Sequence, residues 1–547
     1  MNQKNPVHAP LEEVDVLVVG SGPIGAIFAK TLVSAGKRVV MIDIGEQATR
    51  RVGDHKKNSV AVQKDLSLFT NAVKAELHPL SVPTNNVESY LEPSSWAPTP
   101  KQVGYLQNGQ NPKQNAWDNL PAAAASRVVG GMGSHWTCCT PRQHPGIERS
   151  TLFSDEEWDD LYTRAEEILG TNSTSFDDSI RQQLVKSTLE GAYEKREMLS
   201  MPLACKRSEK NKEYIEWACS ATILGDLANP RYSGDLFEIR ANTQCVKLQL
   251  DDNDGQVAWA VVKDLMSNEK YKIKAKKYVI CAGAVLTPGI LFNSGFTTDE
   301  LPALGHYMME QPMSFCQVVL KTSLVDSVAN AQEGDPKHPD WYAKVQLHKK
   351  KAPNDPLPFP FNDPDPQCYF PLSEDFPWHT QIHRDAFGYG EVPGTIDQRL
   401  VVDFRWFTYV KPVYTNYVEF SNKCKDEFGM PQPTFHFRMD QEDSDRTLDM
   451  VTDMVAVARH VGGFLPGAEP KYLPPGSALH ICGTYRAGES SDDSVVDRAG
   501  KVWGQKNLVL GGCGVIPKEN ACNPTITAAC FALVAAKQLV HDLRITN

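Results

Sequence analysis

The apolar residues near the start of the chain form two short runs joined by a glycine-rich turn and a helical segment. Residues 14–19, Val-Asp-Val-Leu-Val-Val, form the first run, which is typical of a buried strand. A helix with small and apolar positions at Ala29 and Leu32 follows and ends near Gly36. The second run, 38–43, predicts another short strand. This order predicts one strand–helix–strand unit of an α/β domain.

Further along, the pattern indicates one amphipathic helix and then a group of strands. Residues 155–169 follow the helical period, with acidic residues in the first turn. Residues 237–281 contain five short strand-like segments, and 251–255 is a turn between two of them. We therefore expect a small antiparallel insertion that returns to a parallel strand at 278–281.

The second half of the chain contains strands and helices around a proline-rich stretch. Residues 352–366 contain too many prolines for a helix or a central strand. Residues 400–437 predict strands, and 440–460 predict a helix. A final helix follows residues 523–524 and includes the apolar stretch 528–536, which is too short to span a bilayer. The two ends of the chain therefore flank a mixed α/β middle, where we expect the substrate to bind.

The turn after the first strand has the glycine spacing of a dinucleotide-binding motif. Gly20 permits a tight turn, Gly22 lets the backbone approach a pyrophosphate, and Gly25 lets the helix pack on the strand. The helix N-terminus then points free N–H groups at the phosphates. Asp43 ends the second strand about 20 residues later, where an acid accepts hydrogen bonds from ribose hydroxyls. A glycine turn without a ligand would leave this agreement unexplained.

A chain of 547 residues is too long for one compact core, so we expect more than one domain. The fold class that we predict is α/β, with a Rossmann-like nucleotide-binding domain and a substrate domain built on a large mixed or antiparallel sheet. The discontinuous nucleotide-binding domain comprises residues 1–52, 120–155, 205–320 and 470–547. Residues 53–119, rich in Pro, Asn and Gln, form an arm-like excursion. The substrate domain comprises residues 156–204 and 321–469.

Charge and cysteine content exclude several classes of protein. The net charge is −11, and an acidic protein repels phosphate backbones, so we expect no nucleic-acid partner. The N-terminus lacks the apolar core of a signal peptide, and no segment predicts a membrane span, so we expect an intracellular or non-classically exported protein. The 13 cysteines contain no C-x-x-C pair and indicate scattered buried thiols.

His379 and His383 are four residues apart, but without a third ligand and in a strand-like setting we expect no metal site.

Three segments combine glycines with polar or aromatic side chains. Residues 127–141 contain three glycines beside His135 and Thr137, and glycines there would let the backbone approach a flat ring. Taken alone, a histidine beside a tryptophan is more often structural, and Thr137 shares that ambiguity. Residues 278–295 predict a buried strand, a turn and a helix, which fits a second cofactor edge or an ordinary crossover. Residues 378–390 gather aromatic and polar groups that suit sugar hydroxyls and ring faces.

His480 and Asn523 have the chemistry that alcohol oxidation requires. His480 lies in residues 478–483, which we expect to form a short strand, and Asn523 precedes the last helix. A neutral imidazole can take a hydroxyl proton at physiological pH. A second polar group must hold the same oxygen while a hydride leaves. A flavin takes the hydride, because cofactors carry the redox step.

Together these segments resemble the glucose–methanol–choline (GMC) family of flavin oxidoreductases, and its sugar oxidases above all. The resemblance covers most of the chain, and it implies FAD as the cofactor. Gly130-Gly-Met-Gly-Ser-His135-Trp-Thr-Cys is similar to the family segment whose histidine bonds covalently to the flavin, which implies that link for His135. It also places the Thr137 hydroxyl near the reactive end of the flavin. His480 and Asn523 fall on the family's catalytic pair.

The resemblance also implies further site residues. Those implied for the cofactor are Gly20, Gly22, Gly25, Asp43, Gly130, Gly131, His135, Thr137, Val246, Gly283, Gly512, Cys513 and Thr525. Those implied for the substrate are Gln381, Asp385, Phe387, Tyr389, Arg405 and Ala478. Ala478 is smaller than the branched residue expected beside the sugar, which implies a wider pocket.

The implied reaction is oxidation of an aldopyranose such as D-glucose at C2, with oxygen reduced to hydrogen peroxide. The implied partners are a monosaccharide and oxygen, and the implied assembly is a homotetramer. Oxidation at C3, a glycoside substrate and a quinone acceptor stay open, because the position of attack depends on how the sugar is placed. A nicotinamide-dependent dehydrogenase would leave His135 and residues 511–514 without a role. A flavoprotein without activity would leave His480 and Asn523 without one.

Overall fold

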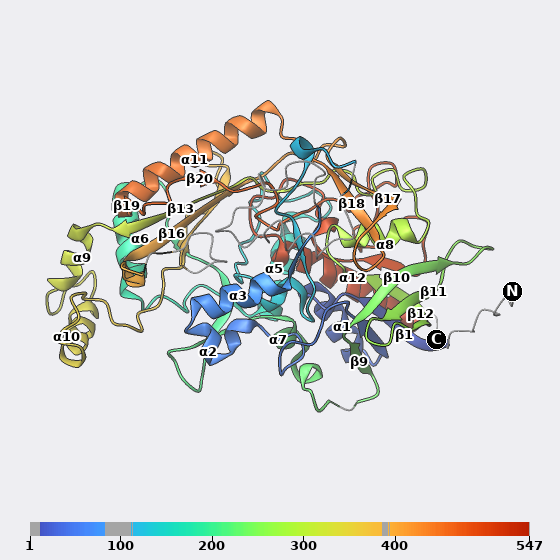
Figure 1. Cartoon of the computed structure of the whole chain (residues 1–547), viewed down its shortest axis with the longest axis horizontal. Coiled ribbons are helices and arrows are strands. Elements are labelled where there is room, and N and C mark those ends of the chain that lie inside the picture. Colours follow the sequence, from blue (N-terminus) through green and yellow to red (C-terminus); the bar gives the residue numbers. More distant parts are fainter. Residues whose placement is uncertain are drawn as a thin grey trace.

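Two seven-stranded sheets organise the described part of the molecule. Figure 1 shows the computed structural model. The structure describes residues 11–81, 111, 113–232, 234–384, 392 and 394–545. Helices α1 and α12 pack against the first sheet. The second sheet lies under the long helix α11, which crosses the top of Figure 1. The helices are α1 (Pro23–Ser34), α2 (Val60–Gln63), α3 (Leu66–Glu76), α5 (Asp155–Leu169), α6 (Ile180–Ala192), α7 (Ser220–Leu224), α8 (Leu286–Asn293), α9 (Thr322–Ala329), α10 (Trp341–Lys351), α11 (Gln441–Val461) and α12 (Thr525–Ile545).

The first sheet is the predicted nucleotide-binding sheet. Its strand order is β10-β11-β12-β1-β2-β9, and β21 pairs with β12. Its strands are β1 (Leu11–Val19), β2 (Val39–Ile42), β9 (Phe237–Arg240), β10 (Thr243–Leu250), β11 (Val257–Asp264), β12 (Lys270–Ile280) and β21 (Leu508–Leu510). β1 pairs in parallel with β2 and β12, whereas β10, β11 and β12 pair antiparallel.

Two details of the expected insertion at 237–281 are wrong. The last two of the five expected segments are one strand, β12, because Ala275 pairs with Val14 of β1 and the strand continues through Lys276. The first segment, β9, pairs in parallel with β2 and lies outside the antiparallel part. The antiparallel part and its return to a parallel strand are confirmed.

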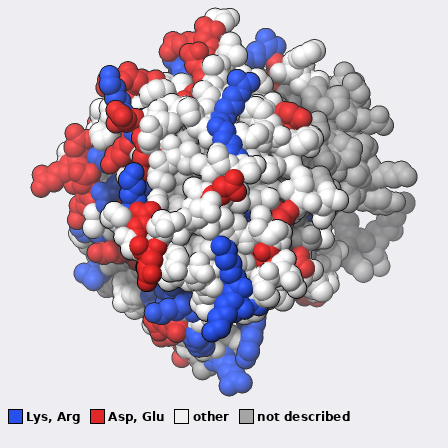
Figure 2. All heavy atoms as spheres, turned by 90° about the vertical axis from the view of Figure 1, so that its left-hand side faces the viewer, with Lys and Arg blue, Asp and Glu red and all other residues white. Residues whose placement is uncertain are grey.

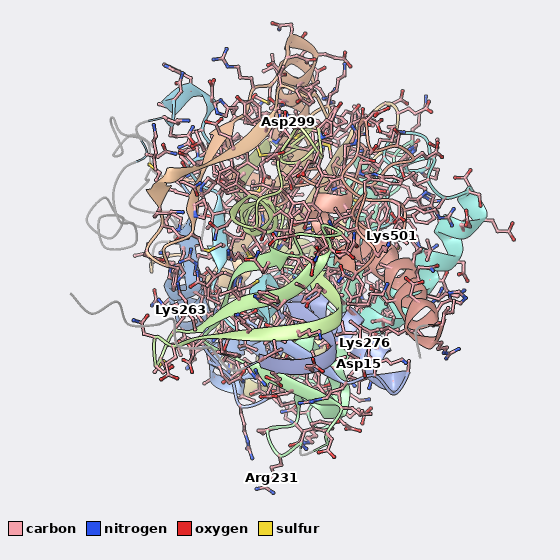
Figure 3. The ribbon with its side chains drawn as sticks, turned by 90° about the vertical axis from the view of Figure 1, so that its right-hand side faces the viewer. Asp15, Arg231, Lys263, Lys276, Asp299 and Lys501 are labelled. Atoms are coloured by element: carbon pink, nitrogen blue, oxygen red, sulfur yellow. The ribbon has the colours of Figure 1, made fainter. Side chains whose placement is uncertain are left out.

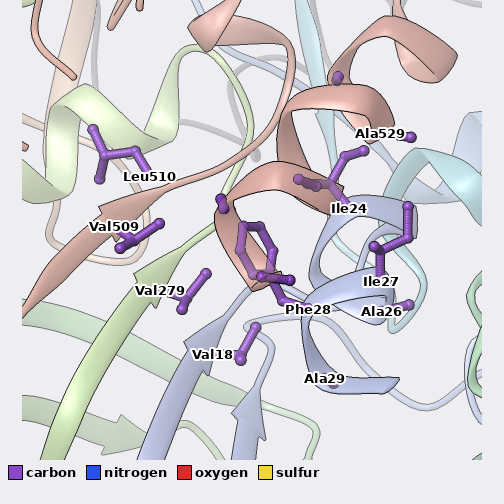
Figure 4. Packing of buried hydrophobic residues seen from close by; sticks show 14 of the residues in the cluster. Val18, Ile24, Ala26, Ile27, Phe28, Ala29, Val279, Val509, Leu510 and Ala529 are labelled. Atoms are coloured by element: carbon purple, nitrogen blue, oxygen red, sulfur yellow. The ribbon is translucent and has the colours of Figure 1, made fainter. Parts of the chain in front are cut away.

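The apolar residues of α1 and of the central strands share one core. β1 is fully buried at Val16, Leu17 and Val18, as expected for a parallel strand covered on both faces. Figure 4 shows Phe28 of α1 beside Val279 of β12, and both belong to the main hydrophobic cluster. This packing holds the glycine turn at the carboxyl ends of the strands.

The second sheet is antiparallel and has two different faces. Its order is β19-β13-β16-β15-β14-β6, and β20 pairs with β13. Its strands are β6 (Leu199–Ser200), β13 (Met313–Leu320), β14 (Cys368–Tyr369), β15 (Trp378–His383), β16 (Val401–Thr408), β19 (Gly462–Phe464) and β20 (Lys471–Tyr472). Phe404 and Trp406 pack in a cluster with Met454 of α11 on one face. Because side chains alternate along a strand, Gln381 and Arg405, which are paired in register, lie on the other face.

Smaller sheets complete the strands. They are β3 (Leu77–Pro79) with β4 (Ala124–Ser126), β17 (Tyr417–Lys425) with β18 (Pro431–His436), and β5 (Thr171–Asn172) with β7 (Leu203–Arg207) and β8 (Ile215–Trp217). The strands expected in 400–437 are therefore confirmed, and 352–366 forms neither helix nor strand.

The predicted helices are confirmed. α5 begins after Ser154, whose hydroxyl accepts from the Glu157 N–H in a capping box, and it ends at Gly170 with φ of 68°. α11 covers the expected 440–460, and α12 follows Pro524. Among the described residues α12 is the one helix long and apolar enough to cross a membrane, but 67% of its apolar window is buried inside the protein. α12 is therefore packed as a core helix.

The described part of residues 53–119 lies partly against the second sheet. Phe69 and Val73 of α3 pack in one cluster with Met313, Phe315 and Phe407. The proposed domain limits stay a prediction.

Charged side chains of both signs are mixed on the surface. On the face shown in Figure 2, acidic and basic residues are interspersed, without a continuous basic track among its described residues. Figure 3 shows Asp15 and Lys276 side by side, and their carboxylate and ammonium groups lie 2.9 Å apart.

Candidate active site

A cavity lies at the carboxyl ends of β1, β2 and β12, where open α/β sheets bind their ligands. It extends from Asp43 to the loops around Ala282 and Cys513, and the hairpin residue Met430 closes part of it. Of the predicted cofactor residues, those lining it are Gly20, Gly22, Gly25, Asp43, Gly131, Gly283, Gly512, Cys513 and Thr525. Gly130, His135, Thr137 and Val246 do not line it. Val246 accepts a hydrogen bond from Asn293 Nδ2 at 2.8 Å, and its neighbour Cys245 lines the cavity.

Two glycines of the turn are required by backbone packing, and the third leaves an open face that can hold a pyrophosphate. A Cβ atom on Gly25 would lie 2.0 Å from the Gly20 carbonyl oxygen, and one on Gly20 would lie 2.3 Å from the Cys281 carbonyl oxygen. A Cβ on Gly22 would find nothing closer than the Gly130 oxygen at 4.0 Å, so this glycine leaves its cavity side open. The turn therefore combines tight backbone packing with an open face at the start of α1, as a bound phosphate requires.

Asp43 connects the turn to the second glycine segment. Its Oδ2 accepts from the Ser21 N–H at 2.9 Å and from the Ser21 hydroxyl at 2.6 Å. The Ser21 oxygen accepts in turn from the Gly130 N–H at 2.8 Å. Burial raises the pKa of Asp43, against these hydrogen bonds, which lower it. Gly130 is thus held behind the cavity wall by its contact with Ser21, a residue that the sequence did not mark as important.

His135 is buried directly behind the cavity. Its Nε2 lies 3.0 Å from the hydroxyl oxygen of Ser126, which lines the cavity. Burial, together with the positive charge of Lys56, lowers the pKa of His135 to about 4. The imidazole is therefore uncharged at neutral pH. Trp136 lines the cavity next to it, and Thr137 is partly buried.

His480 lies in a loop, so the short strand expected at 478–483 is wrong. Leu479 has φ of 59°, which a strand does not tolerate, and only Cys482 forms a single bridge, with Met309. The His480 N–H points at the Glu310 carboxyl group, 3.2 Å from Oε2. The residues on both sides of His480, Leu479 and Ile481, line the cavity. His480 therefore lies at the edge of the cofactor cavity.

Asn523 and Gln381 meet His480 where the two sheets face each other. Asn523 Nδ2 lies 3.2 Å from His480 Nε2, and Asn523 Oδ1 accepts from Gln381 Nε2 at 2.7 Å. Phe407 packs beside the His480 ring, with centroids 5.6 Å apart. Burial lowers the pKa of His480 to about 3, helped by His379 and Arg405. The imidazole is a neutral proton acceptor throughout the ordinary pH range.

The remaining predicted substrate residues are placed only in part. Arg405 is buried on the same sheet face as Gln381 and donates from Nε to His383 Nε2 at 2.9 Å. Ala478 packs against the cluster that contains Phe407. Asp385, Phe387 and Tyr389 lie outside the described residues. Among the described residues no group of His, Cys, Asp or Glu could hold a metal ion.

Sequence reasoning missed Glu310 and Gln311. Both are buried, at 2% and 5% exposure, just before β13. Gln311 contacts the His480 ring, with Oε1 2.8 Å from Nδ1. The signal in the sequence was weak: two polar residues stand between Met308-Met309 and the strand at 313–320, and nothing local shows that they are buried.

The comparisons with known proteins agree with this geometry. Two GMC oxidoreductase family models match, over residues 230–313 and 412–532. A curated relative, "Pyranose 2-oxidase" of Emericella nidulans, is 42% identical over 99% of this chain and 95% of its own.

The chain belongs to the GMC oxidoreductase family.

The chain is also similar to a second curated relative and to a solved structure. "C-glycoside 3-oxidase" of Arthrobacter globiformis is 30% identical over 97% of this chain and 95% of that protein. The crystal structure of formate oxidase superposes with a TM-score of 0.64 at 13% identity, over 98% of this chain and 99% of that chain. At that identity the structural likeness shows the GMC fold alone. The resemblance inferred from the motifs is thus confirmed, and so is the predicted fold class.

Proposed function

We propose that this GMC protein is a flavin-dependent sugar oxidase, which oxidises an aldopyranose such as D-glucose at C2 and reduces oxygen to hydrogen peroxide. The observation that carries the proposal is the 42% identity to a pyranose 2-oxidase over 99% of the chain. The cavity at the carboxyl ends of the first sheet fits FAD, because its glycines leave room for backbone contact with a pyrophosphate. When bound, FAD supplies the hydride acceptor and the route of electrons to oxygen.

The side chains at the junction of the two sheets provide the proton chemistry. His480 Nε2 accepts the proton of the sugar hydroxyl, and burial lowers the pKa of the ring, so that it is uncharged at neutral pH. Asn523 Nδ2, 3.2 Å from that nitrogen, donates to the same hydroxyl oxygen and holds it in place. Gln381 fixes the Asn523 amide through Oδ1. The oxygen is thereby oriented while its carbon loses a hydride.

Sugar recognition is assigned to the polar face of the second sheet. Gln381 and Arg405 are adjacent in register on that face, and Ala478 packs beside it. Asp385, Phe387 and Tyr389 complete the proposed set. Amide and guanidinium groups hold hydroxyl oxygens, and aromatic rings stack on sugar faces. We also propose a homotetramer, by resemblance to the family's sugar oxidases.

His135 is the proposed site of covalent flavin attachment. Two observations support it: the uncharged imidazole is buried, and its Nε2 contacts Ser126 of the cavity wall. Yellow colour that stays with the acid-precipitated protein is the expected result. Colour released into the supernatant would exclude the bond and leave His135 a packing role.

A second candidate function is oxidation at C3, or of a glycoside. It is favoured by the 30% identity to a C-glycoside 3-oxidase and by the small side chain of Ala478. A quinone in place of oxygen is a further variant of the same chemistry.

Anaerobic mixing with excess D-glucose tests the proposal. We expect the visible flavin band to bleach, and to return with hydrogen peroxide when air is admitted. Analysis of the product then distinguishes a 2-keto from a 3-keto sugar. Bleaching without recovery in air would identify a dehydrogenase, and a band that no sugar or glycoside bleaches would contradict the proposal.

A further inference from the structure

Within the part of the chain that the structure describes, the side chain that hydrogen-bonds Nδ1 of the His480 ring is Gln311. Its Oε1 lies 2.8 Å from His480 Nδ1. Its Nε2 lies 2.8 Å from the Asn520 carbonyl oxygen and 2.9 Å from the Cys522 carbonyl oxygen. The Gln311 side chain thus bridges the catalytic loop and the turn that carries Asn523.

The two carbonyl oxygens fix the orientation of the Gln311 amide. A carbonyl oxygen only accepts hydrogen bonds, so the group facing Asn520 O and Cys522 O must be the NH₂ group. If the amide were rotated by half a turn, its oxygen would face two other oxygens, and the two buried hydrogen bonds to the Asn520 and Cys522 carbonyl oxygens would be lost. Each buried polar group left without a partner costs about 1–3 kcal/mol. The amide oxygen therefore faces His480.

A fixed amide oxygen determines which nitrogen of His480 carries the proton. Because Gln311 Oε1 can only accept, His480 Nδ1 must donate, and the neutral ring carries its single proton there. His480 Nε2 then holds the free electron pair. It faces Asn523 Nδ2 at 3.2 Å, a donor, which agrees with this assignment.

We propose that Gln311 is a positioning residue that holds His480 in the tautomer able to accept the substrate proton at Nε2. The proposal rests on the proposed function in so far as His480 is the base. In the other tautomer Nε2 would carry a proton and could not accept one. The carboxyl group of Glu310 supports the same arrangement, because it accepts from the Gln311 N–H at 3.0 Å and from the His480 N–H at 3.2 Å.

The chain offers a matched control in Gln143. Its Nε2 donates to Asn520 Oδ1 at 2.8 Å, so it supports the same turn without contacting His480. Gln311→Met and Gln143→Met each remove a buried amide of similar size. Only the first removes the acceptor at Nδ1.

The first experiment measures the rate constant of anaerobic flavin reduction at saturating sugar. We expect Gln311→Met to lower it about 10–100-fold, by analogy with the loss of a group that orients a metal-binding histidine, with flavin content and sugar affinity kept. Gln143→Met should stay close to the wild-type rate. An unchanged rate in Gln311→Met, or an equal loss in both variants, would overturn the proposal.

A second variant decides the matter if Gln311→Met does not fold. Gln311→Glu keeps an acceptor at Nδ1 but loses the two hydrogen bonds to the Asn520 and Cys522 carbonyl oxygens. A carboxylate beside the ring raises the pKa of the imidazole. The other groups around His480 are Glu310, His379 and Arg405, and the substitution leaves them unchanged. We expect the acid limb of the rate–pH profile to move to higher pH. A limb that stays in place would contradict the proposal.

Nitrogen-15 NMR of the histidine rings reads the tautomer without turnover. The His480 signals, assigned by their loss in His480→Ala, should show a protonated Nδ1 and a bare Nε2 in the wild type. If no sugar bleaches the flavin, the proposed function fails, and this spectrum still judges the role of Gln311. A protonated Nε2 would overturn it.

Discussion

The two large sheets differ in where they place polar side chains. In the first sheet the central strand β1 is buried on both faces. The groups that line the cavity lie just beyond the ends of the strands, at Gly20 and Asp43. In the second sheet one face is apolar under α11, while the other buries Gln381 and Arg405. We propose that the first arrangement binds FAD at the carboxyl ends of the strands, and that the second presents polar groups to the sugar.

This difference separates the two tasks of the enzyme. The cofactor site depends on backbone shape, because its glycines permit contacts that no other residue allows. The proposed substrate site depends on side chains that hold one another through hydrogen bonds, from Gln381 through Asn523 to His480. Substitutions in the two regions should therefore fail in different ways.

The largest effect is expected from Gly25→Ala in the first region. The new Cβ would lie 2.0 Å from the Gly20 carbonyl oxygen, a backbone contact that cannot relax cheaply. We expect protein without flavin, seen as loss of the visible absorbance. In the control Gly191→Ala the Cβ meets nothing within 4 Å inside helix α6, so flavin content should be kept. Equal flavin content in both variants would refute the backbone account.

A pH-dependent effect is expected from Glu310→Gln at the junction. Burial raises the pKa of Glu310 to about 8 from 4.5. Below pH 4.5 the group is protonated in both folded and unfolded protein. Between 4.5 and about 8 the unfolded chain releases the proton that the folded protein keeps, so wild-type stability falls. The variant removes this loss, which reaches about 5 kcal/mol at most.

The melting temperature of Glu310→Gln should therefore exceed that of the wild type by a margin that grows from pH 4 to pH 8. The exposed Glu300→Gln is the control and should show no such trend. A margin that does not depend on pH would mean that Glu310 is ionised in the folded protein.

The smallest effect is expected on the apolar face of the second sheet. Trp406 is fully buried, and its Nε1 donates to Asp453 Oδ2 at 2.9 Å. Trp406→Phe keeps a ring and loses this hydrogen bond, which leaves a buried acceptor with one partner fewer and should cost about 1–3 kcal/mol. Flavin reduction should proceed at the wild-type rate. The exposed Trp117→Phe should change neither stability nor rate. Slower flavin reduction in Trp406→Phe would show that the apolar and polar faces of the second sheet are not independent.

The same contrast explains what the sequence could predict. The glycine turn, α5 and α12 depend on local signals, namely glycine spacing, a helical period with acidic residues in the first turn, and an apolar run, and all three are confirmed. The loop around His480 did not follow from its apolar neighbours, because Leu479 takes a left-handed conformation that only tertiary contacts can stabilise.

The buried glutamine at position 311 was out of reach for a similar reason. Its partners, Asn520 and Cys522, are about 200 residues away in the chain, with separations of 209 and 211. Their side-by-side placement requires both sheets to be folded. Residue resemblance to the family pointed to His480 and Asn523, but it gave no account of what orients them.

Single-turnover flavin reduction in His480→Ala tests the central claim most directly. The substitution lies outside the glycine turn, so we expect normal flavin content and absorbance. Without its proton acceptor the rate constant of reduction by the sugar should fall about 10²–10⁴-fold at neutral pH, as loss of a general base does. Reduction at the wild-type rate, in a variant that carries its full complement of flavin, would show that His480 is not the base and that the junction between the two sheets has another purpose.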